Sequence, residues 1–118
     1  DIAALNRSAA QLQADITTAC GMMNTARPGM PIVLVNLLAI ATASSTAPQR
    51  AQVAAYNSGF AAMIASLKVS GYNVVGADVS GVVTNPDDTA QLFDGVHPTP
   101  AYYDAMGVII ANALMTLL

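Results

Sequence analysis

The run from Pro31 to Ile40 limits the folds open to this chain more than any other segment. It reads Pro-Ile-Val-Leu-Val-Asn-Leu-Leu-Ala-Ile, so a strand built from it carries apolar side chains on both faces. Such a strand must be covered on both faces, as strands are in a parallel sheet between two layers of helices. The run therefore predicts a buried strand over residues 31–40.

A helix is expected before this strand, over about residues 2–25. Apolar side chains recur there at intervals of three and four, which places them on one helical face. These residues are Leu5, Ala9, Leu12, Ile16, Ala19 and Met23. The sequence Arg27-Pro28-Gly29 is expected to end the helix.

A second helix is expected after a small polar loop at residues 41–47. Thr46 and Gln49 have the spacing of a capping box, and Pro48 suits the first turn. The buried face of this helix is expected to hold Val53, Tyr56, Phe60, Met63, Ile64 and Leu67. The helix should end near Gly71, and a shorter strand should follow over residues 73–79. Strand, helix and strand at this spacing predict a parallel βαβ unit.

The rest of the chain predicts a loop over residues 80–98 and a last helix that starts at Thr99 and Pro100. The apolar stripe of that helix is Tyr103, Met106, Ile110, Leu114 and Leu117. The fold class is thus α/β, a three-layer α/β/α sandwich with a parallel sheet. Sheets usually hold four to six strands. We therefore expect the two strands to pair with strands outside these 118 residues, from another chain or a swapped copy.

Composition excludes several classes of function. The net charge is −3 and the four basic residues are scattered, so no basic stripe can bind nucleic acid. The longest apolar run is far shorter than the roughly 18 residues of a membrane span. One Cys and one His exclude a Cys/His metal site and an internal disulfide. Cys20 is expected to be a buried, inert side chain.

The segment Asp94-Gly95-Val96-His97-Pro98 carries the chemistry of the chain. It ends the loop after the second strand, and ligands of open parallel sheets bind beyond the carboxyl ends of strands. A tight turn at Gly95 would let Asp94 accept a hydrogen bond from one imidazole nitrogen of His97, at about 2.6–3.2 Å. The other nitrogen could then take a proton from a nucleophile. The same spacing also fits an ordinary Asp-Gly turn followed by a packed histidine.

The segment resembles the last sequence block of the SGNH (GDSL-type) serine hydrolases, which supplies their catalytic Asp and His. The strand after Arg-Pro, the Tyr56-Asn57 pair and the strand that ends in Asp78 resemble preceding elements of that family. The resemblance implies that Asp94 and His97 are catalytic residues of an ester hydrolase without metal or cofactor. It implies acyl transfer through a serine, on short acyl esters that include acetylated sugars.

The chain departs from the family where the nucleophile and oxyanion hole belong. The Gly-Asp-Ser block, the glycine block and the Gly-x-Asn-Asp block are absent, although Asp1 could be the tail of the last. Tyr102 stands where the family usually has Gly. Ser44 and Ser45 lie in no nucleophile elbow and are interpreted as part of a polar loop. Residues 1–118 are thus expected to be the C-terminal part of one SGNH domain, inactive without a complementary N-terminal polypeptide.

Two other classes remain open. One is a non-catalytic α/β module that has kept the fold and lost the activity. The other is a flavodoxin-like domain that binds a small ligand, for which no phosphate-binding loop is visible. We interpret Asn57 as a residue that bonds backbone and Asp78 as a support of the 80–98 loop. A secreted or extracellular location is also expected.

Overall fold

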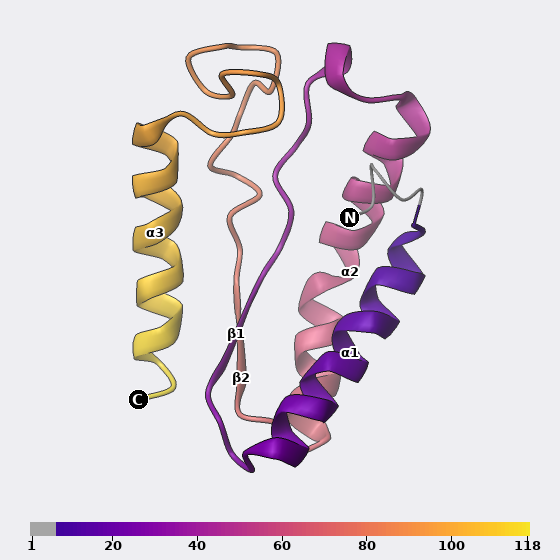
Figure 1. The fold of residues 1–118 in the computed structure, drawn as a ribbon, viewed down its shortest axis with the longest axis vertical. Coiled ribbons are helices and arrows are strands. Elements are labelled where there is room, and N and C mark those ends of the chain that lie inside the picture. Colours follow the sequence, from indigo (N-terminus) through magenta and orange to yellow (C-terminus); the bar gives the residue numbers. More distant parts are fainter. Residues whose placement is uncertain (1–6) are drawn as a thin grey trace.

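A computed structural model of the protein describes residues 7–118 (Figure 1). Its elements in chain order are α1 (Ala9–Ala26), β1 (Ile32–Val35), the 3₁₀ helix η1 (Thr42–Ser44), α2 (Ala47–Val69), β2 (Val74–Ala77) and α3 (Pro100–Met115). Two sequence-based predictions, the role of Asp1 and the place of Leu5 in the first apolar stripe, lie outside the described residues.

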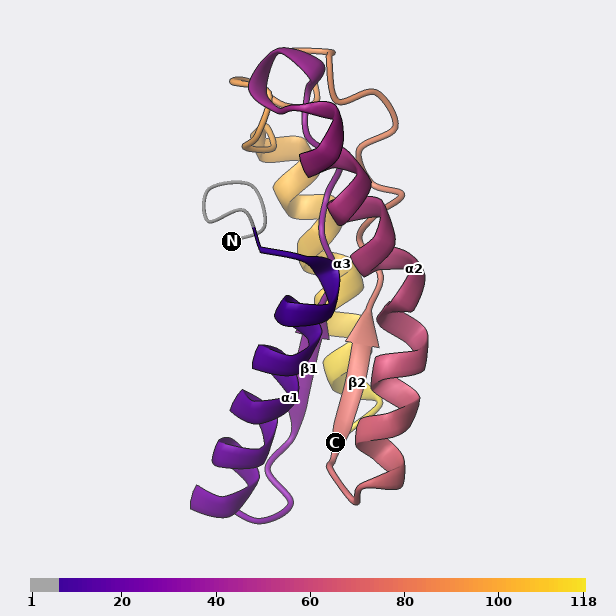
Figure 2. The ribbon, with the colours of Figure 1, turned by 90° about the vertical axis from the view of Figure 1, so that its right-hand side faces the viewer.

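The two strands pair in parallel, with Ile32 opposite Val74 and Val35 opposite Ala77. The helices form two layers, with α3 on one side of the strands and α1 and α2 on the other (Figure 1). Turned by 90°, the molecule shows α1 on the β1 side of α2 (Figure 2). The predicted three-layer α/β fold with a parallel sheet is confirmed.

Both strands are shorter than predicted, and β1 ends for a specific reason. The amide of Asn57 in α2 accepts a hydrogen bond from the Leu37 N–H at 2.9 Å and donates one to the Leu37 carbonyl at 2.7 Å. The ladder itself stops at Asn36, because the Val79 N–H, which the next ladder bond would join to the Asn36 carbonyl, donates instead to Asn36 Oδ1 at 2.7 Å. The Asn57 bonds then hold the backbone at Leu37 to α2. The prediction of a strand through Ile40 was therefore wrong, whereas the prediction that Asn57 bonds backbone is confirmed.

The helix α1 begins later than predicted because Ser8 caps it. The Ser8 hydroxyl accepts from the Gln11 N–H, and the Gln11 side chain accepts from the Ser8 N–H. Its buried residues are Ala9 and Cys20, whereas Ala19, a member of the predicted apolar stripe, is exposed. Leu12, Ile16 and Met23 are half-buried against the core, as the stripe predicted.

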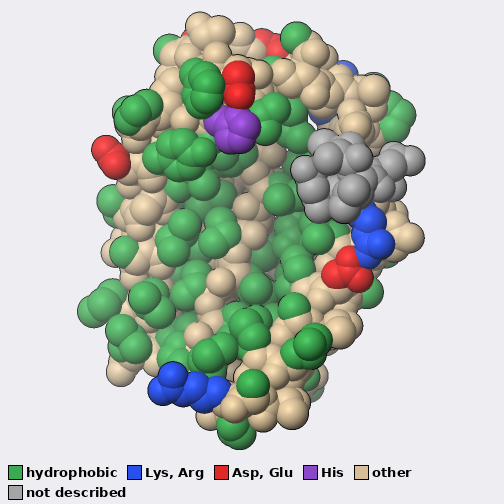
Figure 3. All heavy atoms as spheres, viewed as in Figure 1, with side chains coloured by type: hydrophobic (Ala, Val, Ile, Leu, Met, Phe, Trp, Pro, Cys, Tyr) green, Lys and Arg blue, Asp and Glu red, His purple; other side chains and the backbone are tan. Residues whose placement is uncertain are grey.

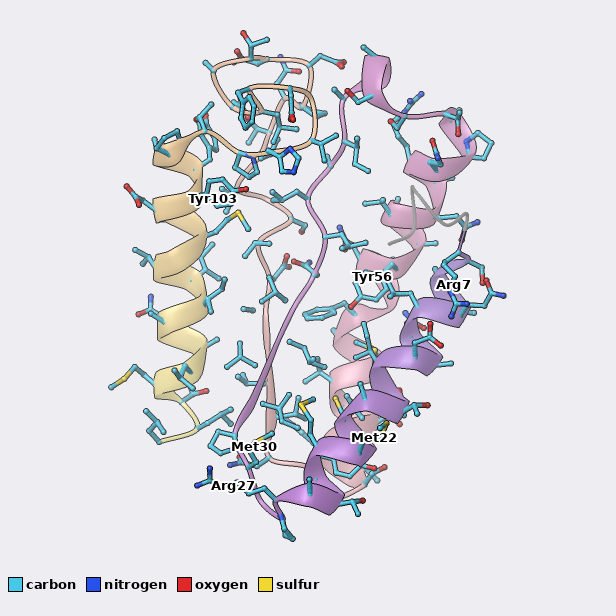
Figure 4. All side chains as sticks on the ribbon, viewed as in Figure 1. Arg7, Met22, Arg27, Met30, Tyr56 and Tyr103 are labelled. Atoms are coloured by element: carbon cyan, nitrogen blue, oxygen red, sulfur yellow. The ribbon has the colours of Figure 1, made fainter. Side chains whose placement is uncertain are left out.

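The helix α2 supplies most of the core. The predicted capping box of Thr46 and Gln49 is present, and the six predicted side chains are the buried ones. Tyr56 of α2, labelled in Figure 4, is 1% exposed and belongs to the buried core cluster. Cys20 of α1 is fully buried in the same cluster, and burial raises the pKa of its thiol. The layer of α1 and α2 is thus well packed.

The helix α3 differs, since none of its residues is buried. Its predicted stripe is only partly covered: Met106, Ile110 and Leu117 are half-buried, while Tyr103 and Leu114 are 49% and 39% exposed. Both belong to the predicted stripe, but the described residues leave them largely uncovered. Within residues 7–118, β1 pairs only with β2, so the sheet has two strands. A sheet this narrow covers only part of the apolar face of α3. No helix in the described range is long and apolar enough to cross a membrane.

Candidate active site

The loop between β2 and α3 lies at the carboxyl end of both strands (Figure 1). A polar cluster fixes its start. The Asn36 side chain, 5% exposed, donates to Asp78 Oδ1 at 2.6 Å and accepts from the Val79 N–H at 2.7 Å. Asp78 Oδ1 also accepts from the N–H and hydroxyl of Ser80. The hydrogen bonds from Ser80 and Asn36 lower the pKa of Asp78, so it stays an acceptor.

The far end of the loop folds back on itself. Leu92 and Pro98 form an antiparallel bridge, and the Phe93 N–H donates to the His97 carbonyl at 3.0 Å. Gln91 is 8% exposed, and its side-chain oxygen accepts from the backbone of Thr84 and residue 85. Residues 91–99 therefore form a small closed hairpin although they contain no regular strand.

Asp94 and His97 meet at the tip of this hairpin. Asp94 Oδ2 lies 2.7 Å from His97 Nδ1, and Oδ1 accepts from the N–H groups of Val96 at 3.0 Å and His97 at 2.7 Å. Gly95 makes the turn possible, since its φ of 81° is one that other residues rarely adopt. The predicted contact between the carboxylate and the imidazole is confirmed.

The charge of Asp94 decides which nitrogen of His97 carries the proton. The backbone N–H of His97, followed by its side chain, lowers the pKa of Asp94 to about 2. At neutral pH the carboxylate is ionised and can only accept hydrogen bonds, so Nδ1 must be the donor. In the neutral imidazole, Nε2 is then left with a lone pair that can take a proton.

The pair is open to solvent. The side chains of Asp94 and His97 are 41% and 58% exposed. The Phe93 ring stacks beside the imidazole with ring centroids 5.8 Å apart. No group among residues 7–118 forms a hydrogen bond with Nε2. The histidine, purple in Figure 3, stands at one end of a broad face of apolar side chains.

Neither serine near the pair is placed to act as its nucleophile. The Ser44 hydroxyl donates to the Asp94 carbonyl at 3.1 Å, and the Ser45 hydroxyl donates to the Ala41 carbonyl at 2.8 Å. Both bonds are to backbone, in agreement with a polar loop. Among the described residues, no three His, Cys, Asp or Glu side chains gather where they could hold a metal ion.

The groups that hold the loop left no direct sign in the sequence. Asn36 interrupts an apolar run of the sequence, yet in the structure its side chain bonds the residues after β2. Phe93 and Gln91 carried no pattern at all. A polar residue inside a run predicted to be buried was the one available signal, because a buried amide must find partners.

Comparison with known proteins supports the fold. No family model matches the sequence, and no curated protein matches it. An acetyl esterase, solved as a serine-to-alanine mutant with acetate ion, is similar with a TM-score of 0.80 and 21% identity. A carbohydrate esterase family 3 structure from Talaromyces cellulolyticus is similar with a TM-score of 0.81 and 21% identity. Each match covers 99% of this chain and 53% of the other, so this chain spans about half the length of these proteins.

Proposed function

We propose that this chain contributes the Asp–His part of a serine ester hydrolase of the SGNH type. The observation that carries the proposal is the 2.7 Å contact of Asp94 Oδ2 with His97 Nδ1, on an exposed turn beyond the carboxyl ends of the strands. The free Nε2 of His97 is the second requirement of a general base. Two esterases with the same fold support this chemistry over a flavodoxin-like binding module.

In the proposed mechanism a serine from outside these 118 residues attacks the ester carbonyl. His97 Nε2 takes the serine proton and then gives it to the leaving alcohol. Asp94 holds the Nδ1–H and stabilises the imidazolium while it exists. Hydrogen-bond donors for the oxyanion come from the same part as the serine. The names of the similar proteins favour acetyl esters, including acetylated carbohydrates, as substrates.

The proposal includes a complementary N-terminal polypeptide segment, in the same longer chain or in a second one. Three observations support it: the β1 edge that no strand of the described range 7–118 pairs with, the unburied α3, and similar proteins about twice as long. Figure 3 looks onto β1 and shows apolar side chains between α3 and α1. A secreted or extracellular location stays a prediction.

Hydrolysis of p-nitrophenyl acetate tests the proposal. The chain alone should be no faster than imidazole at equal concentration, and addition of a polypeptide with the Gly-Asp-Ser half should create activity. His97→Ala should then lower kcat by about ten-thousand-fold, with Asp94→Asn equal or somewhat weaker, since each removes one member of a triad. Asp104→Asn, an exposed acid on α3, is the control.

A serine-directed phosphonate distinguishes the alternatives. It should label the added polypeptide and leave Ser44 and Ser45 unmodified. Activity and labelling of this chain by itself would show that the nucleophile lies among its own residues. A completed protein that folds but shows no ester hydrolysis would favour the non-catalytic α/β module.

A further inference from the structure

Two hydrogen bonds join the Asp94 turn to the segment that follows β1. The Ala41 N–H donates to the Gly95 carbonyl at 2.9 Å, and the Ser44 hydroxyl donates to the Asp94 carbonyl at 3.1 Å. Each bond holds one peptide group of the turn. The backbone that carries the Asp94 carboxylate is thus anchored to η1, far away in the sequence.

A third connection runs through Asp87. Its Oδ1 accepts from the Thr42 N–H at 2.7 Å and from the Thr42 hydroxyl at 2.9 Å. The Asp87 N–H itself donates to the Asn85 side chain, which steadies the acid within its own turn. Hydrogen bonds to an ionised acceptor are the stronger ones, so this pair ties η1 firmly to the middle of the loop.

Gly95 allows the two segments to approach this closely. A Cβ at this position would lie 2.8 Å from Ala41 Cβ and would collide with the Ser44 hydroxyl. A small cavity of about 190 Å³ lies between η1 and the loop, lined by Ser44, Asp87 and Asp94 among others. The loop and η1 are therefore in van der Waals contact at Gly95, and polar side chains bridge the space around it.

We propose that Thr42, Ser44 and Asp87 form a clamp that positions the Asp94–His97 pair for catalysis. This inference rests on the proposed function. Asp94 Oδ1 is held by N–H groups of the turn itself, and the bonds from Ser44 and Ala41 to the Asp94 and Gly95 carbonyls hold the shape of that turn from outside. η1 is the next element after β1 in the chain, separated from it by residues 36–41, so the clamp links the turn of the imidazole to the carboxyl end of the sheet, where the nucleophile must be placed. The three residues touch neither substrate nor imidazole and are positioning residues.

Nitrogen-15 NMR of His97 at pH 8 tests the clamp without any substrate, because the chain has a single histidine. The ring shifts report the ratio of Nδ1–H to Nε2–H tautomers, which the Asp94 contact controls. Asp87→Ala should lower this ratio by about tenfold, the factor given by loss of about 1.4 kcal/mol. Asp87→Asn keeps an oxygen acceptor and should restore most of the ratio. Asp88→Ala is the matched control, since among residues 7–118 its carboxylate bonds neighbours in its own segment, Ala90 and Gln91, and not η1.

A second variant covers the case in which Asp87→Ala does not fold. Ser44→Ala removes one exposed hydroxyl and should shift the ratio in the same direction. A wild-type ratio in the folded variants, or an equal shift in Asp88→Ala, overturns the clamp. In the completed hydrolase the clamp variants should lower kcat by about tenfold and leave KM unchanged. A tautomer shift with no ester hydrolysis would keep the clamp and reject the proposed function.

Discussion

The helices α2 and α3 begin alike and cover opposite faces of the same two strands, yet they are buried to very different extents. Each starts with a threonine cap and a proline in its first turn. Six residues of α2 are buried, whereas α3, which carries an equally clear apolar stripe, buries none. The difference is one of surroundings, because α2 packs against α1 and the sheet while α3 meets the two strands alone.

This contrast separates two properties that are often both inferred from an apolar stripe: which face of the helix turns to the sheet, and how deeply that face is buried. The period of the stripe determines which face of a helix turns to the sheet. The depth of burial depends on how many elements surround that face. In α3 the apolar stripe turns to the two strands, but too few elements among residues 7–118 pack around it. Its side chains therefore keep a large exposed area.

The largest expected effect compares two leucines, one on each helix. Leu67 is 2% exposed and Leu114 is 39% exposed. Leu67→Ala should lower the free energy of unfolding by about 2–5 kcal/mol, because it removes buried methyl groups and leaves a cavity. Leu114→Ala should lower it by less than about 1 kcal/mol. Urea unfolding of both variants measures the difference, and equal losses would contradict the contrast between the helices.

A smaller effect is expected at the two threonine caps. The Thr46 hydroxyl accepts from the Gln49 N–H in the capping box of α2, whereas the Thr99 hydroxyl makes no cap bond and donates to the Ala90 carbonyl. Thr46→Ala should cost about 1 kcal/mol of unfolding free energy. Thr99→Ala should cost less and should instead speed hydrogen exchange in residues 90–98. A Thr99→Ala loss as large as that of Thr46→Ala would show that α3 is as firmly capped as α2.

The smallest effect concerns the turn that leads into α3. The pKa of Asp94 is lowered from 3.8 to about 2, so its carboxylate stabilises the fold fully above about pH 4. That contribution is lost as the pH falls through 2. Carbon-13 NMR should show the same low titration in wild type and in Leu114→Ala, because the bonds to Asp94 are local. A midpoint near 3.8 in Leu114→Ala alone would mean that the turn depends on the packing of α3.

The sequence was sufficient for features set by local chemistry. The six buried side chains of α2, its capping box and the Asp94–His97 contact each depend on residues a few positions apart. The features it missed depend on distant partners. Asn57 bonds the backbone of Leu37, Asn36 ends the strand pairing by accepting from Val79, and Asp87 accepts from Thr42. Hydrogen bonds of this kind leave no periodic signal, so only the folded chain reveals them.

The burial of Cys20 makes the rate of local opening of the core measurable. This thiol is the only one in the chain, it is fully enclosed in the core where α1 meets α2, and burial disfavours its reactive thiolate form. A thiol reagent can reach it only in the moments when α1 lifts away from its neighbours. The labelling rate therefore counts those openings. Departures of one helix from the core can be timed in this way at a natural residue, without an introduced mutation.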